Sequence, residues 1–269
     1  MTYDIANNKR YTNPDTLAAK TMRSIRDNRL HLLHIPLTNS RNGKMTPEDI
    51  QARVLYRDAL VLIIDKPAGL PVHAGPGGGP NLEQSFDALR FGLQRPPALV
   101  HRLDRDTSGC LVLGRHPKAL RKAGMIFAAG RAEKTYWAVV HGAPPQDAGV
   151  IDLALKKETP KRGWKMIVSA DGQRSETHYK VRGRSGDLTW LELTPRTGRT
   201  HQIRVHCAAL GFPVVGDPLY GAAPPTQPLM LHARAISLPL YPSRPPIAAV
   251  AAPPSHMAEL LRSCGWKSD

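Results

Sequence analysis

The sequence predicts an α+β fold with a mixed, mostly antiparallel sheet and with flanking helices and loops. Short runs of β-branched and aromatic residues recur along the chain, and Asp171-Gly172 and Ser185-Gly186 are typical hairpin turns between them. Helical segments are interspersed without a regular alternation of strand and helix, which is the pattern of α+β proteins. The chain has 269 residues and is 41% hydrophobic, so it is long enough to bury a substantial core.

The chain divides into two regions of different character. Residues 1–50 are polar and basic with little periodicity, and they predict an N-terminal arm with one short helix near residues 16–27. Residues 51–269 carry the remaining predicted strands and helices and are expected to form a single domain.

The first half of that domain is predicted to alternate strands with two helices. A β-branched run followed at once by Lys-Pro-Ala-Gly indicates the first strand. Asn81 is a suitable N-cap for the first helix, and Pro117 and Gly130 bracket the second. The predicted elements are strand 58–64, helix 81–93, strand 110–113, helix 117–129 and strand 134–141.

The second half is predicted to be a strand-rich meander followed by helices and one more strand. Thr200 is expected to cap a short helix that ends before Gly211. A proline-rich tract, residues 224–254, surrounds the last strand and is otherwise expected to be loop. The predicted elements are strands 150–155, 164–169, 176–181 and 188–193, helix 201–210, strand 229–238 and helix 256–263.

The net charge is the first indication of function. Thirty-seven Lys and Arg residues face 22 Asp and Glu residues, which gives a formal charge of +15. Such an imbalance is typical of proteins that bind a polyanion. A purely solubilising surface is the alternative. Binding to a membrane surface would require a basic amphipathic helix with large apolar residues on its other face, and the sequence has no convincing one.

Cysteine content and apolar runs indicate a cytoplasmic protein. The three cysteines are Cys110, Cys207 and Cys264, and their odd number and wide spacing predict neither a disulfide framework nor a metal site. The first 20 residues contain no apolar core of a signal peptide. The longest strongly apolar run, residues 59–64, is far shorter than the roughly 20 residues that a membrane span needs.

The segment 101–109, His-Arg-Leu-Asp-Arg-Asp-Thr-Ser-Gly, is the most informative part of the sequence. It is a polar loop between two apolar runs, and it gathers carboxylates, cationic groups and hydroxyls. A carboxylate among arginines stays ionised, because nearby positive charge favours the charged form. Such a group is a poor general acid and a fair nucleophile. The residue types alone also fit a structural, salt-bridged turn.

The order of residues in this segment, His-Arg-Leu-Asp followed by Thr-Ser-Gly, resembles the catalytic motif of RluA-type pseudouridine synthases. In that family the aspartate attacks the target nucleoside, so the resemblance implies that Asp104 is the nucleophile. Arg102 looks like the family's arginine that enters the RNA stack in place of the flipped nucleotide.

Five further segments, in the family's order, carry the same resemblance. Residues 134–142 are similar to its Lys-x-Tyr strand, whose tyrosine, here Tyr136, stacks on the target base and is a candidate base for the C5 proton. Residues 199–206 resemble its Arg-x-His-Gln-Ile-Arg motif, whose isoleucine packs on the base and whose last arginine, here Arg204, pairs with the aspartate. The remaining segments are 65–70, 216–221 and 231–233.

The resemblance therefore implies a catalytic group and a set of residues that bind the substrate. The catalytic candidates are Asp104, Tyr136 and Arg204. The substrate-binding candidates are Arg102, His101, Ile203, Arg199, His201 and Lys134.

The activity that the resemblance implies is isomerisation of uridine to pseudouridine in RNA. The reaction exchanges an N1–C1′ bond for a C5–C1′ bond without redox change, so neither a cofactor nor a metal is expected. Ribosomal and transfer RNA both fit, and attack of Asp104 at C1′ or at C6 stays open. No S4 RNA-binding domain is clear in residues 1–50, so the chain resembles the compact members, and a monomer is expected.

Other features are assigned ordinary roles. The glycine-rich segment 75–80 lacks the Lys-Ser/Thr of a phosphate-binding loop, and His201 and His206 lack the spacing of a zinc pair. Asp106 is expected to be a structural hydrogen-bonding residue. Residues expected in the core are Met166, Trp164 and Trp190.

Two functions from other classes are weighed against the synthase. A non-catalytic RNA-binding or ribosome-assembly factor would have no need of Asp104, Tyr136 and Arg204 together. A basic hydrolase acting on nucleic acid would be expected to carry clusters of metal-ligating carboxylates or histidines, and none is evident in the sequence.

Overall fold

A computed structural model of the chain describes residues 45–75, 78–159, 163–221 and 224–268. These residues belong to one compact unit, which spans residues 35–269. The predicted helix near residues 16–27 and most of the predicted arm lie outside the described residues. The division of the chain at residue 51 stays a prediction, although the first described helix, α2 (Pro47–Ala52), spans it and buries Ile50.

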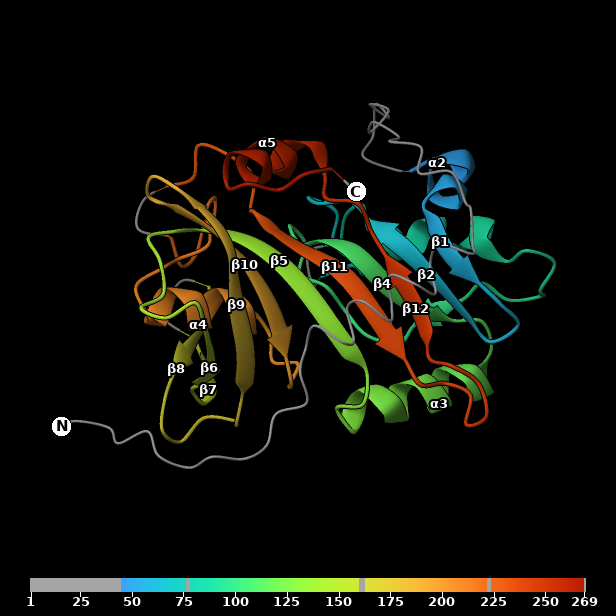
Figure 1. The fold of residues 1–269 in the computed structure, drawn as a ribbon. Coiled ribbons are helices and arrows are strands. Elements are labelled where there is room, and N and C mark those ends of the chain that lie inside the picture. The colour runs from blue at the N-terminus through green and yellow to red at the C-terminus, as the bar shows by residue number, and fades with distance from the viewer. Residues whose placement is uncertain (1–44, 76–77, 160–162, 222–223, 269) are drawn as a thin grey trace. The chain divides into compact units, whose positions relative to one another are not determined.

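The described residues form short helices and many strands, as Figure 1 shows. The strands are β1 (Val54–Arg57), β2 (Val61–Lys66), β3 (Ala98–Leu99), β4 (Ser108–Gly114), β5 (Glu133–His141), β6 (Ala148–Asp152), β7 (Leu155–Glu158), β8 (Lys165–Val168), β9 (Glu176–Ser185), β10 (Leu188–Pro195), β11 (Leu231–Leu238) and β12 (Ile247–Val250). Besides α2, the helices are the 3-10 helix η1 (Leu82–Leu89), α3 (Pro117–Ala128), α4 (Gln202–Ala209) and α5 (Ser255–Ser263). None of the helices described is long and apolar enough to cross a membrane.

One large sheet carries most of the strands, in the order β1-β2-β4-β11-β5-β10-β9-β6. β12 pairs with β11, and β3 pairs with β4. Among these pairs β4 and β11 run parallel, and the others are antiparallel. β7 and β8 form a separate two-stranded sheet. The predicted α+β class with a mixed, mostly antiparallel sheet is therefore confirmed.

The first four residues of β2 are buried on both faces of the sheet, which explains the uninterrupted apolar run at residues 61–64. Val61 and Ile63 belong to a core that includes residues of α3, β11 and β12. Leu62 and Ile64 point to the other face and join a core with α2 and η1. Successive side chains of a strand alternate between faces, so a strand covered on both sides needs apolar residues at every position.

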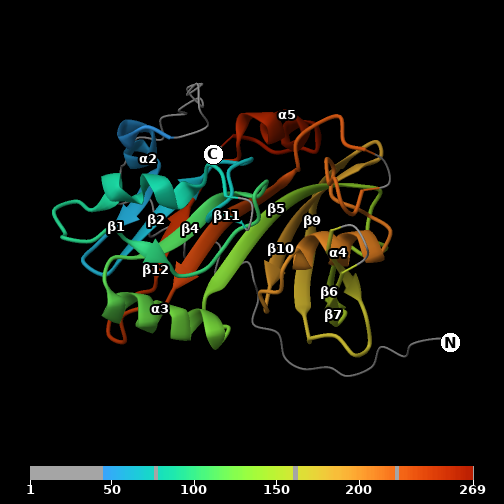
Figure 2. The same ribbon diagram turned by 180° about the vertical axis from the view of Figure 1, so that it is seen from behind.

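A third core lies under the other half of the sheet, between β5, β9 and β10 and the helices α4 and α5. Seen from behind in Figure 2, α4 lies across β9 and β10, and α5 lies along the top edge of the sheet. Ile203 and Cys207 are the α4 residues buried here, and Trp190 contributes from β10. The prediction that Trp190 belongs to the core is confirmed.

The predicted strand 58–64 is wrong at its start. The Asp58 carboxylate accepts hydrogen bonds from the backbone N–H groups of Leu60 and Val61, both at 2.8 Å. This side chain makes a turn between β1, which was not predicted, and β2. Aspartate side chains commonly satisfy backbone donors in turns in this way, and β2 begins only at Val61.

Other predicted elements also differ in type or extent. The predicted helix 81–93 is a shorter 3-10 helix, and the Asn81 side chain donates to the carbonyl of Gly79 instead of capping it. The predicted strand 150–155 is divided, because Asp152 ends β6 in the large sheet and Leu155 begins β7 in the small one. The predicted strand 229–238 begins two residues later, and the proline-rich tract contains the unpredicted strand β12.

The predicted starts of the helices α3 and α4 have different outcomes. α3 is confirmed, with Pro117 in its first turn, and the ring of His116 accepts from the N–H of Ala119 as its N-cap. The predicted cap of α4 at Thr200 is wrong. His201 occupies that position, with a left-handed φ of 54°.

The parallel pairing of β4 with β11 depends on a glycine. Gly109 lies opposite Ala233 and has a φ of +105°. A Cβ atom at this position would lie 2.3 Å from the carbonyl oxygen of Ala233. The two strands can therefore approach only where no side chain stands between them.

We predict that Gly109→Ala strongly destabilises the fold, because it combines a backbone clash with an unfavourable φ. The expected loss is about 3 kcal/mol or more in the free energy of unfolding, measured by urea denaturation. Gly124→Ala is the matched control, since nothing lies within 4 Å of its Cβ position in α3. That variant should be neutral or more stable by up to about 1 kcal/mol. Equal stability of the two variants would contradict the role of Gly109.

Candidate active site

An open cavity of about 840 Å³ lies where the loop before β4, the strand β5 and the start of α4 meet. Its wall contains every residue that the sequence predicts for the site. They are Asp104, Tyr136, Arg204, Arg102, His101, Ile203, Arg199, His201 and Lys134. Segments separated by about a hundred residues are brought together here by the sheet order β4-β11-β5-β10.

The loop that carries Asp104 is fixed at both sides of that residue. Leu103 is buried in the core formed with α2 and η1. The N–H of Thr107 donates to the carbonyl of Asp104 at 3.2 Å, which closes a turn. The Asp104 carboxylate remains about one quarter exposed, on the cavity side. The backbone is thus held while the carboxylate faces the open space.

Lys66, at the end of β2, ties this loop to the neighbouring turn. Its side chain is fully buried, and its ammonium donates to the carbonyls of Pro67, Leu70 and Arg105 at 2.7–2.8 Å. Burial lowers the pKa of Lys66 to about 7, although Asp106 and other carboxylates oppose the shift. Three acceptors match the three N–H groups of a protonated lysine, so the observed geometry corresponds to the charged form.

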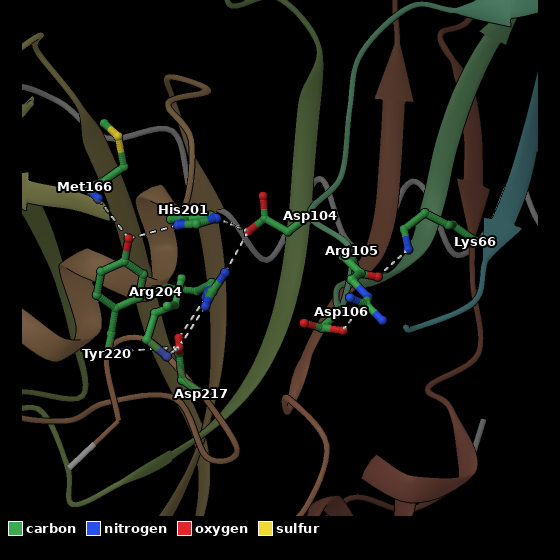
Figure 3. Close-up of polar contacts among 10 residues, drawn as sticks. Lys66, Asp104, Arg105, Asp106, Met166, His201, Arg204, Asp217 and Tyr220 are labelled. Atoms are coloured by element: carbon green, nitrogen blue, oxygen red, sulfur yellow. Dashed lines mark hydrogen bonds and ion pairs between the residues drawn. The ribbon is translucent and has the colours of Figure 1, made fainter. Parts of the chain in front are cut away.

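Arg204 lies between two carboxylates, as Figure 3 shows. Its Nε and Nη2 donate to the two oxygens of Asp217, both at 2.7 Å. Its Nη1 lies 3.4 Å from Oδ2 of Asp104. The predicted partner Asp104 is therefore the weaker contact, and Asp217 holds the guanidinium in a bidentate pair of the strong, planar kind.

The pKa shifts of Asp217 and Arg204 favour the charged form of both side chains. Burial by itself raises the pKa of Asp217, but the hydrogen bonds and charge of Arg204, with the N–H groups of Leu219 and Tyr220, more than offset this and hold the pKa below its ordinary value. The pKa of Arg204 is raised, since the two carboxylates outweigh its burial. Arg204 is thus a permanent cation in the cavity wall.

His201 connects the same centre to a tyrosine. Its Nδ1 shares a hydrogen bond of 2.8 Å with the Tyr220 hydroxyl, which also accepts from the N–H of Met166 (Figure 3). Its Nε2 lies 3.9 Å from the Asp104 carboxylate. Burial lowers the pKa of His201, although Asp104 opposes the shift. When the hydroxyl donates to Nδ1, the neutral ring carries its proton on Nε2, facing Asp104.

Tyr136 and Lys134 reach the cavity from β5. Burial raises the pKa of Tyr136, and the nearby charge of Asp104 adds to this, so the phenol is protonated near neutral pH. Burial lowers the pKa of Lys134 to about 8, and its ammonium donates to the carbonyl of Thr197 at 3.0 Å. Both side chains belong to the cavity wall, but Lys134 already has a protein partner.

Of the other predicted binding residues, two are packed inside the protein and two are exposed. His101 accepts from the N–H of Val112 at 3.0 Å and stacks on Phe127, and burial lowers its pKa to about 3, so its contacts position the loop. Ile203 is buried at the cavity wall. Arg102 and Arg199 are exposed, where they can meet a ligand.

Several residues at the site were missed from the sequence. Asp217 and Tyr220 lay within the matched segment 216–221, but nothing in the sequence assigned them a partner. Gly216 explains their placement, since its φ is +75° and a Cβ there would lie 2.1 Å from the carbonyl oxygen of Pro228. Lys66 stood in another matched segment, and its burial was not evident.

Two other predictions about single residues have different outcomes. Trp164 does not belong to the core, because it is 44% exposed and its ring stacks on His201 at 5.2 Å. It follows an exposed glycine and lies outside the large sheet. Asp106 contacts Arg105 within the loop at 3.9 Å. Among the described residues no cluster of three or more His, Cys, Asp or Glu side chains has the arrangement of a metal site.

Comparison with known proteins identifies the part of the chain that forms this cavity. The sequence model of the RNA pseudouridylate synthase family matches residues 60–209. An uncharacterised RNA pseudouridine synthase of Zymomonas mobilis is 43% identical over 212 residues, which cover 77% of this chain and 96% of that protein. The ribosomal large subunit pseudouridine synthase D of Xanthomonas campestris is 45% identical over 182 residues, which cover 66% of this chain and 54% of that protein.

The fold has a counterpart among solved structures. The human protein named RNA pseudouridylate synthase domain containing 4 superposes with a TM-score of 0.69 at 26% sequence identity. The superposition covers 81% of this chain and 95% of that one.

We predict that Asp217→Asn destabilises the fold by about 3–5 kcal/mol, because it leaves Arg204 as a poorly paired buried charge. The measurement is urea denaturation at pH 7. Since the pKa of Asp217 is depressed in the folded state, the wild type should keep this stabilisation above the ordinary aspartate pKa and lose it as the pH falls through the folded value.

Asp87→Asn is the control for that experiment. Asp87 pairs with Arg90 three residues away on an exposed surface, so its loss should change stability by less than about 0.5 kcal/mol. A similarly small effect of Asp217→Asn would show that the buried pair does not stabilise the site.

Proposed function

The chain belongs to the RNA pseudouridylate synthase family, and on this basis we propose that it isomerises specific uridines in structured ribosomal or transfer RNA, with Asp104 as nucleophile and without a cofactor. The observation that carries the proposal is the placement of the Asp104 carboxylate, which faces the cavity with Arg204 Nη1 at 3.4 Å. A carboxylate that faces an open cavity and is held beside a fixed cation is suited to act as a nucleophile.

The reaction requires little more than this carboxylate and a shielded site. The N1–C1′ bond of uridine breaks, the uracil turns, and C5 bonds to C1′ while the C5 proton leaves and N1 gains a proton. Asp104 would form a temporary bond to C1′ or to C6, and the same carboxylate would be released at the end. All atoms of the product come from the substrate and solvent, so no external group is consumed.

Arg204 would aim the carboxylate of Asp104. Asp217 holds two nitrogens of the guanidinium, so the third, Nη1, can point only toward Asp104. A group that is fixed before the substrate arrives does not have to reorganise during the reaction. Arg204 therefore acts on the nucleophile, and Asp217 is its positioning residue.

Tyr136 would offer its ring to the target uracil. Its raised pKa makes loss of the phenolic proton unfavourable near neutral pH. Stacking is consequently favoured over service as the base that removes the C5 proton, the other function considered for it. Ile203 lines the same cavity and would pack on the base.

A uridine in folded RNA must leave its stack to reach this cavity. Extrusion of a base costs a few kcal/mol, and an inserted side chain offsets part of that cost. Arg102 is exposed beside Asp104, and its Nη1 lies 3.3 Å from Nε2 of His73. We assign it to the gap that the flipped nucleotide leaves.

The charge of the chain supports RNA as the partner, and a cytoplasmic monomer is part of the same proposal. A formal charge of +15 suits contact with phosphates. Three relatives are named as ribosomal large subunit pseudouridine synthases, C of two Buchnera aphidicola subspecies and D of Xanthomonas campestris, which favours ribosomal RNA as the first substrate to test.

The test of Asp104 is release of tritium from RNA labelled at C5 of uridine. Transcripts of ribosomal and transfer RNA are incubated with the wild type or with Asp104→Asn, in the presence of a chelator. The wild type should release tritium despite the chelator, and Asp104→Asn should release none above background, since an amide is not a nucleophile of this kind. Activity of Asp104→Asn near that of the wild type would exclude Asp104 as nucleophile.

For Tyr136, two variants separate the ring from the hydroxyl. Tyr136→Phe keeps the stacking face and should retain most of kcat/KM, while Tyr136→Leu should lose about 5- to 100-fold, the range expected for stacking of one base. The same tritium assay measures both. If Tyr136→Phe is as inactive as Tyr136→Leu, the phenolic oxygen takes part in the reaction and the stacking assignment is wrong.

A further inference from the structure

A second hollow of about 610 Å³ adjoins the candidate active site. It is formed by the hairpin β7–β8, the turn at residues 171–173 and the segment 198–200. The two spaces share part of their walls. The shared residues are Arg102, Trp164, Gly198, Arg199 and Thr200. A ligand that extends from the Asp104 cavity can therefore pass directly into the second hollow.

The second hollow is strongly cationic. Its wall holds Arg102, Lys156, Lys157 and Arg199, and Asp171 is the carboxylate among its lining residues. Asp171 is already paired with Lys156. The remaining positive charge would attract a negatively charged ligand such as a phosphate.

Trp164 provides a flat apolar surface in the middle of this charge. It is 44% exposed, whereas Trp137 and Trp190 are buried below 10%. Its ring is nearly parallel to that of His201, with an interplanar angle of 17°. His201 in turn lies 3.9 Å from Asp104, so a continuous set of contacts leads from the second hollow to the proposed nucleophile.

Lys157 lies close to the same ring. It pairs with Met166 across the hairpin, and its ammonium is 5.1 Å from the centre of the Trp164 ring. Its side chain is exposed, and a lysine has a flexible stem of four carbons. When another planar group stacks on the indole, the Lys157 ammonium can therefore move from the ring to a phosphate.

We propose that the second hollow binds a nucleotide next to the target uridine in the same RNA strand. Its base stacks on Trp164, and Lys157 and Arg199 bind its phosphate. Exposed aromatic rings among mobile cations are the usual means of holding single-stranded nucleic acid, because every base has a face to stack. The inference rests on the proposed function, and it adds a subsite that selects RNA in which the neighbouring nucleotide is unpaired.

The first experiment measures binding without catalysis. A fluorescein-labelled oligouridylate of ten nucleotides is titrated with wild type, Trp164→Ala, Trp164→Phe and Lys157→Gln at low salt. We expect Trp164→Ala to weaken binding by about 5- to 100-fold and Trp164→Phe by less than about threefold, because phenylalanine keeps a stacking face. Lys157→Gln should weaken binding and reduce its salt dependence.

Lys165→Gln is the matched control on the same hairpin. Lys165 is an exposed lysine that pairs with Glu158 and lines neither hollow. It should bind the oligouridylate as the wild type does. Thermal melting of each variant checks that the fold is retained. If Trp164→Ala is unstable, the binding of Trp164→Phe still tests the proposal.

The second experiment identifies the nucleotide. In a transcript that the wild type modifies, each nucleotide that flanks the target is replaced in turn by an abasic sugar, and kcat/KM is measured for the wild type and for Trp164→Ala. The abasic replacement at one flanking position should lower the wild-type value about 5- to 100-fold and should have little further effect on Trp164→Ala. Equal effects on both enzymes at every position would overturn the proposal, as would unchanged binding of oligouridylate by Trp164→Ala.

These outcomes are separate from failure of the proposed function. If the wild type modifies no transcript, the synthase proposal fails, while the oligouridylate titration still tests the hollow. If the wild type is active and Trp164→Ala equals it in both experiments, the synthase proposal stands and the subsite is rejected.

Discussion

Arg204 enters the cavity as a fixed cation because Asp217 binds two of its nitrogens from inside the protein. The rest of the site is arranged around this pair. Asp104 lies against the remaining nitrogen, and the Asp217 carboxylate also accepts from the N–H groups of Leu219 and Tyr220, which brings the Tyr220 hydroxyl to His201. A buried charge pair adds little stability compared with an apolar replacement, but removal of one partner is costly, and the pair allows one geometry when all its hydrogen bonds are made.

The sheet supplies the second constraint, since it holds the two halves of the cavity at a fixed separation. The loop of Asp104 enters β4, whose Gly109 permits the close parallel contact with β11. β11 in turn pairs with β5, which carries Tyr136. Lys66 fixes the same loop from the opposite side through the carbonyl of Arg105. Backbone contacts buried on both faces of the sheet thus position a carboxylate that is itself open to the ligand.

The two hollows form one continuous surface with different chemistry at each end. The Asp104 end has fixed, buried partners, which suits a reaction that needs an exact position. The Trp164 end has an exposed ring and exposed lysines, which suits binding of varied nucleotides. His201 lines the Asp104 end and connects it to the other end, because it stacks on Trp164 and faces Asp104.

The sequence by itself determined the strands β4, β5 and β10, the helix α3, and nine of the residues that line the cavity, because local apolar patterns and short motifs are properties of adjacent residues. The tertiary structure decided what those residues contact. Asp217 as the partner of Arg204, the burial of Lys66 and the exposure of Trp164 depend on segments far apart in the chain, and no local pattern records them. The misplaced starts of β2 and α4 have a more local cause, since a side-chain hydrogen bond of Asp58 and a left-handed His201 overrode the intrinsic preference of each segment.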